Sequence, residues 1–343
     1  MAHPVPFAMR AVRFDRYGSS EVLKVRTIPV PGPGRNDVLV RVHASGLNPK
    51  DAIVRQGGLR LLTGRAFPRG TGYDFSGEVV AYGADVSDLT HGDRVWGFLD
   101  GFLGGAAAEY AVVPREWMSA MPPRLRWVEA AALPLVGATA LQGLRDGARL
   151  GAGERVLIKG ASGGVGSAAI QIAKALGAQV TALASGPGID HCRGLGADRV
   201  VDYRRTAPEF LEERFDVFLD CVGRSPYRAY RRLFARGGRW VTIAPEPVVY
   251  ALTPISRLLA PVLGGPRLGY VAVRPRRADL EELGRLVEGG LLRMPVTAMY
   301  PLDEIGAAHD AVAGLHGRGK QVIVISPEAL SERDAGNEAV EVS

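Results

Sequence analysis

The chain has 343 residues, of which 47% are hydrophobic and 23% are charged, and its formal net charge is +6. Such values are typical of a soluble globular protein, and the length is sufficient for two domains that each bury a core. No apolar stretch approaches the ~20 residues of a membrane helix, and no basic block is interleaved with aromatic residues. The sequence therefore predicts neither membrane insertion nor nucleic-acid binding.

Only two cysteines are present, Cys192 and Cys221. Two thiols cannot build a disulfide framework or a four-thiolate zinc site. The first residues, "MAHPVPFAMRAVRF", lack the charged and apolar regions of a secretory signal. We therefore expect a reducing, cytoplasmic location.

Short alternating segments separated by turn residues make up the chain as far as residue 127. Residues 37–46 alternate apolar and polar side chains and then reach Gly46, which predicts a half-buried strand leaving its sheet. The same pattern recurs, with Gly, Asp or Pro at the joints, in residues 75–86, 92–98 and 106–114. This part is predicted to be a small, antiparallel, β-rich domain.

The rhythm changes to strand, helix, strand between residues 128 and 295. Residues 155–160, "RVLIKG", form a continuous apolar run typical of a strand buried on both faces, and a helical pattern follows it and ends at Gly177. Further strands are predicted at 179–185, 198–203, 215–223, 238–245 and 269–275. An α/β fold with a doubly wound parallel sheet is expected here.

The domain boundaries follow from these two patterns. Residues 296–325 give one more strand, helix and strand, which we expect to return to the β-rich domain. We therefore predict one domain from residues 1–127 and 296–343 and a second from residues 128–295.

The glycine-rich stretch "GASGGVG" lies between the first buried strand and its helix. Gly160, Gly163 and Gly166 can serve the tight turn, the approach of a pyrophosphate and the packing of helix on strand. The helix N-terminus then offers free N–H groups and a positive dipole end to phosphates. In a strand–turn–helix followed by further βα units, this pattern predicts a dinucleotide site.

A hydrolase nucleophile elbow is the rival interpretation, because residues 160–164 also spell G-x-S-x-G. Ser162, Asp220 and His309 even follow the Ser…Asp…His order of α/β-hydrolases. Against this, His309 falls within a predicted helix, and an elbow leaves Gly166 unexplained. The hydrolase stays a remote alternative.

The end of the second strand bears on which dinucleotide binds. NAD-binding folds place an acid about 20 residues past the motif, where it accepts hydrogen bonds from the ribose 2′-OH. Here that strand ends at Ser185, and no acid appears before Asp190. A carboxylate would repel a 2′-phosphate and Ser185 can donate to one, so we expect NADPH.

The segments "ASGLNPKD", "GYDFSGEVV", "GDRVWGF", "GASGGVG" and "LGADRVVDY" resemble the zinc-free quinone oxidoreductase group of the medium-chain dehydrogenase/reductase superfamily, which includes zeta-crystallin. The resemblance implies a GroES-like barrel, a Rossmann domain and a cleft between them. It implies that Ser185 and Tyr203 contact the 2′-phosphate, and that a C-terminal stretch closes over the cofactor. The implied pyrophosphate contacts are Ser162, Gly164 and Val165, and the closing stretch is Gly317, Arg318 and Gly319.

Zinc-dependent relatives carry a Cys and a His in the segments that here hold Asn48 and Tyr73. Neither side chain offers the thiolate or imidazole that zinc prefers, so we expect no metal. Without a Lewis acid, quinones and α,β-unsaturated carbonyls are the expected hydride acceptors, because a hydrogen-bond donor suffices for their delocalised charge. Tyr73 is the candidate donor, with a packed aromatic as its alternative, and Asn48 is expected to position the nicotinamide ribose or the substrate.

Two further functions remain open. The chain also resembles mitochondrial-type enoyl-thioester reductases, although Leu59 stands near the place of their catalytic tyrosine. A non-catalytic NADPH-binding protein is the other. The apolar segments 57–67 and 246–265 predict a hydrophobic substrate. The resemblance, together with an exposed edge at strand 269–275, predicts a homodimer.

Overall fold

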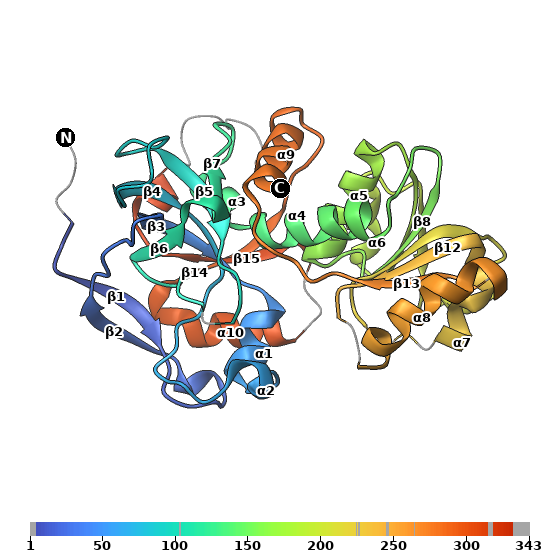
Figure 1. Cartoon of the computed structure of the whole chain (residues 1–343), viewed down its shortest axis with the longest axis horizontal. Helices are drawn as coiled ribbons and strands as arrows, with labels where there is room; N and C mark the ends of the chain where they lie inside the picture. The colour runs from blue at the N-terminus through green and yellow to red at the C-terminus, as the bar shows by residue number, and fades with distance from the viewer. Residues whose placement is uncertain are drawn as a thin grey trace, which may run out of the picture.

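A computed structural model describes residues 5–102, 104–223, 225, 227–244, 247–263, 265–314 and 318–331. Figure 1 shows two lobes, with the N-terminal and C-terminal strands together in one and the middle of the chain in the other. In the described residues, no helix has the length and apolar content needed to cross a bilayer.

The first lobe is built on a mostly antiparallel, seven-stranded sheet in the order β14-β15-β3-β4-β5-β7, with β6 paired to β3. A separate ribbon joins β1 and β2. The strands are β1 (Ala8–Arg13), β2 (Lys24–Pro29), β3 (Asp37–Gly46), β4 (Asp74–Tyr82), β5 (Arg94–Phe98), β6 (Tyr110–Pro114), β7 (Met118–Ala120), β14 (Val296–Pro301) and β15 (Lys320–Val324).

The C-terminal strands return to this sheet, as expected. β15 pairs antiparallel with the end of β3, where Val322 lies opposite Gly46, and β14 pairs parallel with β15. The chain beyond residue 296 therefore shares the sheet of the first lobe, while the boundaries at residues 127 and 296 stay predictions.

The second lobe contains a six-stranded, all-parallel sheet in the order β10-β9-β8-β11-β12-β13. Numbered along the chain, this is the order 3-2-1-4-5-6 of a dinucleotide-binding Rossmann fold, and the order reverses between β8 and β11. The predicted fold class is confirmed. The strands are β8 (Arg155–Lys159), β9 (Gln179–Ala184), β10 (Arg199–Asp202), β11 (Phe215–Asp220), β12 (Phe234–Thr242) and β13 (Arg267–Tyr270).

Helices connect these strands and link the lobes. Helix α4 contacts α5 and α9 and lies where the two lobes meet (Figure 1). The helices of four residues or more include α1 (Pro49–Arg55), α2 (Arg60–Thr63), α3 (Trp127–Ala131), α4 (Pro134–Leu141), α5 (Gly164–Ala175), α6 (Gly188–Gly194), α7 (Tyr227–Tyr230), α8 (Pro247–Leu263), α9 (Arg277–Glu288), α10 (Ile305–Ala313) and α11 (Glu328–Ser331).

The last strand of the parallel sheet corrects one prediction. It ends at Tyr270, so most of the expected strand 269–275 lies outside the sheet. The side chain of Gln142 explains this, because its Nε2 donates to the carbonyl oxygen of Arg274 at 2.7 Å and its Oε1 accepts from the Arg274 amide at 3.2 Å. These bonds hold the segment against the end of α4. The outer side of β13 is still the edge of the sheet.

Candidate functional site

The glycine loop between β8 and α5 has the geometry that a phosphate-binding turn requires. Gly160 has a φ of +70°, a conformation that L side chains rarely adopt. A Cβ on Gly166 would lie 2.3 Å from the carbonyl oxygen of Gly160, so only glycine lets the helix pack this closely on the turn. A Cβ on Gly163 would meet nothing nearer than 3.5 Å, which leaves the space above this residue open.

The first turn of α5 supplies donors beside that open space. Gly163 is the N-cap, and Ser167 N makes the first bond of the helix, to Gly163 O at 2.8 Å. The amides of Gly164, Val165 and Gly166 precede it and have no partner within the helix. Donors of this kind, at the positive end of a helix, are suited to a pyrophosphate.

The segment before β15 lies against this loop. Gly319 N donates to the carbonyl oxygen of Ser162 at 3.3 Å, and a Cβ on Gly164 would be 3.2 Å from Lys320 Cδ. Arg318 precedes Gly319 and is exposed, whereas Gly317 lies outside the described residues. The structure therefore brings Gly319, one of the three predicted closing residues, to the glycine loop.

Ser185 and Tyr203 are also brought together. Ser185 follows β9 and Tyr203 follows β10, and Ser185 Oγ donates to Tyr203 Oη at 2.9 Å. Arg204 and Arg205 come next and are exposed. These two cations lie beside the pair on the same edge of the sheet, and sequence reasoning did not single them out, although consecutive arginines directly after a strand were a visible signal.

Asn48 is part of a buried network with two residues that sequence reasoning missed. Its Nδ2 donates to Asp74 Oδ2 at 2.7 Å, and its Oδ1 accepts from Lys320 Nζ at 2.7 Å. The Lys320 ammonium also donates to the Leu47 carbonyl at 2.6 Å and lies 3.3 Å from Asp74 Oδ2. Burial raises the pKa of Asp74, while Lys320 and the donors around the carboxyl oppose that rise. Asp74 also accepts from Leu135 N, at the start of α4.

Tyr73 lies one residue before this network, at the start of β4, with 1% of its surface exposed. Lys50 Nζ lies 4.0 Å from the centroid of its ring and 5.0 Å from that of Phe102. Burial, assisted by the nearby Asp51, raises the pKa of the Tyr73 hydroxyl, which therefore stays protonated. Burial lowers the pKa of Lys50. The Lys50 side chain thus ends over the face of the Tyr73 ring.

The hydrolase alternative is not supported by the positions of its residues. His309 Nε2 is paired with Thr71 Oγ1 at 3.2 Å, not with Ser162, and burial lowers its pKa to about 3. Asp220 accepts from the backbone amides of Val222 and Gly223 at 3.0 and 2.9 Å. No described hydrogen bond joins any two of the three residues, so the structure does not support the remote alternative of a Ser162 nucleophile.

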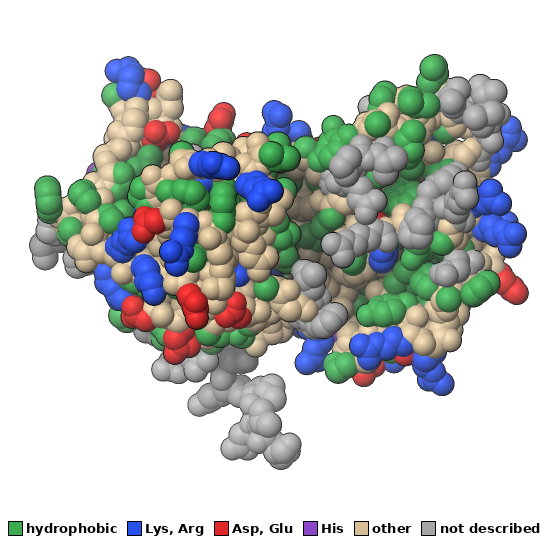
Figure 2. All heavy atoms as spheres, turned by 90° about the horizontal axis from the view of Figure 1, so that it is seen from below, with side chains coloured by type: hydrophobic (Ala, Val, Ile, Leu, Met, Phe, Trp, Pro, Cys, Tyr) green, Lys and Arg blue, Asp and Glu red, His purple; other side chains and the backbone are tan. Residues whose placement is uncertain are grey.

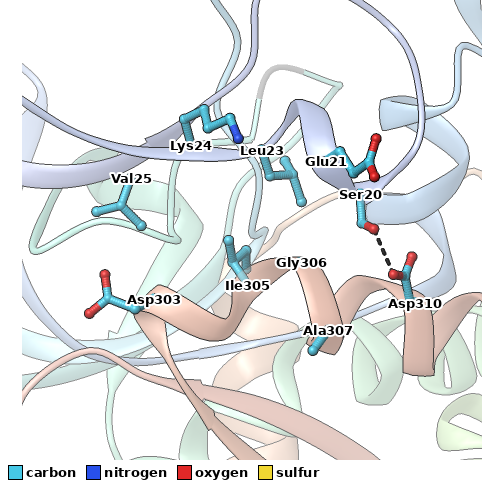
Figure 3. Close-up of a pocket in the computed structure, with 10 residues that line it drawn as sticks. All are labelled: Ser20, Glu21, Leu23, Lys24, Val25, Asp303, Ile305, Gly306, Ala307 and Asp310. Atoms are coloured by element: carbon cyan, nitrogen blue, oxygen red, sulfur yellow. Dashed lines mark hydrogen bonds between the residues drawn. The ribbon is translucent and has the colours of Figure 1, made fainter.

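The molecular surface is hollowed between the two lobes (Figure 2), and a separate pocket of about 560 Å³ lies on the first lobe. That pocket lies between η1 (Ser20–Val22), β2 and α10, and Figure 3 shows Ser20 Oγ directed at the Asp310 carboxylate, 2.6 Å away. No predicted site residue lines it, so we place the reaction site elsewhere.

Comparison with known proteins identifies the family. Residues 34–123 match the alcohol dehydrogenase GroES-like domain, and residues 195–323 match the zinc-binding dehydrogenases. Over 329 residues the chain is 32% identical to a chloroplastic quinone-oxidoreductase homologue of Spinacia oleracea, with 93% of this chain and 98% of the relative covered. The chain belongs to the quinone oxidoreductase-like group of the medium-chain dehydrogenase/reductase superfamily.

Two further comparisons agree with this assignment. A trans-enoyl reductase of Aspergillus terreus is 35% identical over 351 residues, with 95% of this chain and 98% of the relative covered. The solved structure of the quinone oxidoreductase from Coxiella burnetii has a TM-score of 0.83 at 30% identity, covering 93% of this chain and 100% of that one. As a member of this medium-chain group, the protein is an NAD(P)H-dependent oxidoreductase.

One matching family model is named for zinc, but the side chains here do not fit that metal. Among the described residues, no group of three or more His, Cys, Asp or Glu side chains could hold an ion. Asn48 already uses its amide on Asp74 and Lys320, and the Lys320 ammonium places a positive charge beside that carboxylate. An added Zn²⁺ would find neither a thiolate nor an imidazole here and would be repelled by the ammonium.

Proposed function

We propose that the protein reduces quinones or α,β-unsaturated carbonyls with NADPH and without a metal. The observation that carries this proposal is the Lys50 ammonium, 4.0 Å from the ring centroid of the buried Tyr73. Two potential donors to a substrate oxygen therefore lie together, one residue away from the network of Asn48, Asp74 and Lys320.

The cofactor, when bound, supplies a hydride to an electrophilic carbon. The chain's own part is then to stabilise the negative charge, which appears on an oxygen conjugated with that carbon. A hydrogen bond from the Tyr73 hydroxyl or the Lys50 ammonium provides this stabilisation, and Lys50 or water returns the proton that completes the reduction. Reduction of an isolated ketone would need the several kcal/mol of charge stabilisation that a metal supplies. A reduction that leaves the charge on a delocalised enolate or hydroquinone does not need it.

The preference for NADPH is supported by the second and third strands of the parallel sheet. Ser185 and Tyr203 present hydroxyls at the strand ends, and Arg204 and Arg205 add two exposed positive charges. A 2′-phosphate gains donors and opposite charge there, whereas the neutral 2′-hydroxyl of NADH has no charge to pair with the arginines.

An enoyl thioester is the second candidate substrate, favoured by the similarity to the trans-enoyl reductase of Aspergillus terreus. Its α,β-unsaturated thioester has the same requirement for an oxyanion donor. A non-catalytic, NADPH-binding protein is the third candidate, which turnover alone separates from the other two.

Purified protein should be tested for NADPH oxidation with a quinone, a 2-alkenal, an enone and an enoyl thioester in parallel. We expect turnover with at least one of these acceptors, retained after chelation and in protein whose elemental analysis shows no stoichiometric zinc. Protein that binds NADPH but reduces none of them would contradict the catalytic proposal. Activity that is lost on chelation and restored by zinc would contradict its metal-free form.

Assembly and location remain proposals. We propose a homodimer in which the outer edge of β13 pairs with its symmetry mate, since an open strand edge favours pairing. The expected substrate is hydrophobic, and the cytoplasmic location stays a prediction.

A further inference from the structure

A second pocket, of about 580 Å³, lies on the first lobe beside α2. Its lining residues are three arginines, two aromatic residues and a leucine: Arg16, Tyr17, Arg60, Leu61, Arg65 and Phe67. Four of them lie in segment 57–67, from which the sequence predicts a hydrophobic substrate, but none is part of the candidate site described above, and no carboxylate is among them. Such a lining is suited to an anion that also carries an apolar or aromatic part.

The two aromatic rings that line the pocket are held in place by neighbouring groups. Tyr17 and Phe67 pack edge to face with centroids 5.1 Å apart, and Tyr17 Oη bonds to Thr63 Oγ1 at 2.6 Å and to the Gly64 carbonyl. The buried Arg69 places its guanidinium 5.2 Å from the Phe67 ring centroid. The rings are therefore fixed before any ligand arrives, which lowers the entropy cost of binding.

The three arginines at the rim differ from other exposed arginines of this lobe. Arg10, Arg26 and Arg35 each form an ion pair, with Asp303, Asp15 and Asp85 respectively. Among the described residues, Arg16, Arg60 and Arg65 have no ion pair and no side-chain hydrogen bond. The carboxylate nearest in sequence, Asp15, is held by Arg26. Three unpaired guanidinium groups thus converge on one pocket.

We propose that this pocket binds an organic phosphate with an aromatic ring, its phosphates on Arg16, Arg60 and Arg65 and its ring on Tyr17 and Phe67. Guanidinium groups pair with phosphate oxygens in bidentate fashion, and nucleobases stack on aromatic rings and on arginine. A nucleotide combines both parts. The inference does not depend on the proposed reaction, because it concerns binding and can be measured without turnover.

The concave shape favours a small molecule over a membrane surface. Leu61 and Leu62 are 95% and 70% exposed at the same place, and basic residues around exposed leucines can also bind anionic lipid. The two rings, however, line a pocket and are only partly exposed, so a flat bilayer has less access to them than to the two leucines. Lipid binding is therefore treated as the competing outcome.

The test uses adenosine 3′,5′-bisphosphate as the probe and titration calorimetry as the readout. The pocket variant carries Arg16→Gln, Arg60→Gln and Arg65→Gln. Its matched control carries Arg231→Gln, Arg232→Gln and Arg236→Gln, which removes three exposed arginines, also without ion pairs among the described residues, from the second lobe. Both variants keep the proposed cofactor site, so a difference between them reports the pocket.

We expect wild type and control to share a binding event that is at least ~10-fold weaker in the pocket variant, equivalent to about 1.4 kcal/mol. A second variant, Phe67→Leu, should weaken the bisphosphate while leaving inorganic pyrophosphate unchanged. Coenzyme A and ATP, titrated in parallel, distinguish a thioester carrier from a free nucleotide as the source. Equal affinity of all variants for the bisphosphate would overturn the proposal. It would also be overturned if the pocket variant lost its binding to phosphatidylglycerol vesicles but bound the bisphosphate as tightly as the wild type.

Discussion

The ammonium of Lys320 lies 2.7 Å from Oδ1 of Asn48, and the two residues are 272 positions apart in the sequence. Because Nδ2 of the same amide donates to Asp74, the orientation of Asn48 is fixed from both sides. The first residue of β15 thereby holds the segment that begins α1, which carries Lys50. The network positions the proposed donors, and the expected role of Asn48 towards ribose or substrate stays a prediction.

Replacing Lys320 by Met should destabilise the protein by about 3–5 kcal/mol, because it leaves the Asp74 carboxylate buried without its cation. Urea denaturation measures this change. The double variant Lys320→Met/Asp74→Asn should lose less than the sum of the two single variants. Additive losses would show that the ammonium and the carboxylate do not interact energetically.

Two glycines of the nucleotide loop should respond differently to the same substitution. Gly166→Ala places a Cβ 2.3 Å from the Gly160 carbonyl and should cost about 1–3 kcal/mol of stability. Gly163→Ala meets nothing within 3.5 Å and should cost less than about 1 kcal/mol, yet abolish NADPH binding by filling the approach to the helix N-terminus. Thermal unfolding and NADPH fluorescence separate the two effects. Normal NADPH affinity in Gly163→Ala would move the pyrophosphate away from this loop.

The glycine loop was predictable because its signals are local. A buried run, three glycines and an amphipathic helix occupy residues 155–177 in sequence. The strand, the helix, the turn at Gly160 and the close packing at Gly166 are as predicted, while the approach of a pyrophosphate at Gly163 stays a prediction. The return of the last strand to the sheet of the first lobe was also predictable, because residues 296–325 show a strand–helix–strand pattern. The strand at 269–275 was predicted too long, because the Arg274 backbone pairs with the side chain of Gln142 and no pattern near residue 274 reveals this contact.

The network of Asn48, Asp74 and Lys320 could not be predicted in this way. Lys320 is separated from Asp74 by 246 positions, and its only sequence signal is a charged residue at the start of an apolar strand. Such residues are usually solvated, but this one is buried where β15 joins the sheet between β14 and β3. The contact between Lys50 and Tyr73 likewise requires α1 to be folded over the start of β4.

Cofactor preference gives the third prediction. NADPH should bind at least ~10-fold more tightly than NADH, a difference of about 1.4 kcal/mol. Ser185→Asp should reverse much of this difference, because it replaces a donor by a carboxylate that repels the 2′-phosphate. Protein fluorescence titrations with both cofactors measure it. Equal or tighter NADH binding by the wild type would contradict the assignment.

Buried His309 should make stability fall in mild acid. Burial, with Arg55 nearby, lowers its pKa from 6.5 to about 3, while Asp310 acts in the opposite direction. Between these values the unfolded chain binds a proton that the folded chain does not, so stability decreases as the pH falls. From pH 7 to pH 5 this single group should remove about 2 kcal/mol. His309→Gln should flatten the pH dependence of the unfolding free energy by that amount, whereas an unchanged slope would show that His309 titrates normally in the fold.

The last prediction separates the two proposed donors by substrate and by pH. A quinone is easily reduced and should need a donor least, whereas a 2-alkenal develops charge on an oxygen that nothing else stabilises. Tyr73→Phe, if its hydroxyl acts only in the transition state, should lower alkenal turnover by ~10²–10³ and quinone turnover far less, with NADPH affinity nearly unchanged.

If the Lys50 ammonium is the donor, Lys50→Met rather than Tyr73→Phe should lower alkenal turnover far more than quinone turnover. Because burial lowers the pKa of Lys50, wild-type alkenal reduction should then fall as the pH rises through that lowered value, and Lys50→Met should lack this limb. If the Tyr73 hydroxyl is the donor, its raised pKa means that the rate of alkenal reduction should not fall in this way over the pH range of the assay. Steady-state rates across pH for both acceptors decide between them. If neither substitution slows alkenal reduction, the pair packs the wall of the site, and the donor must be a bound water.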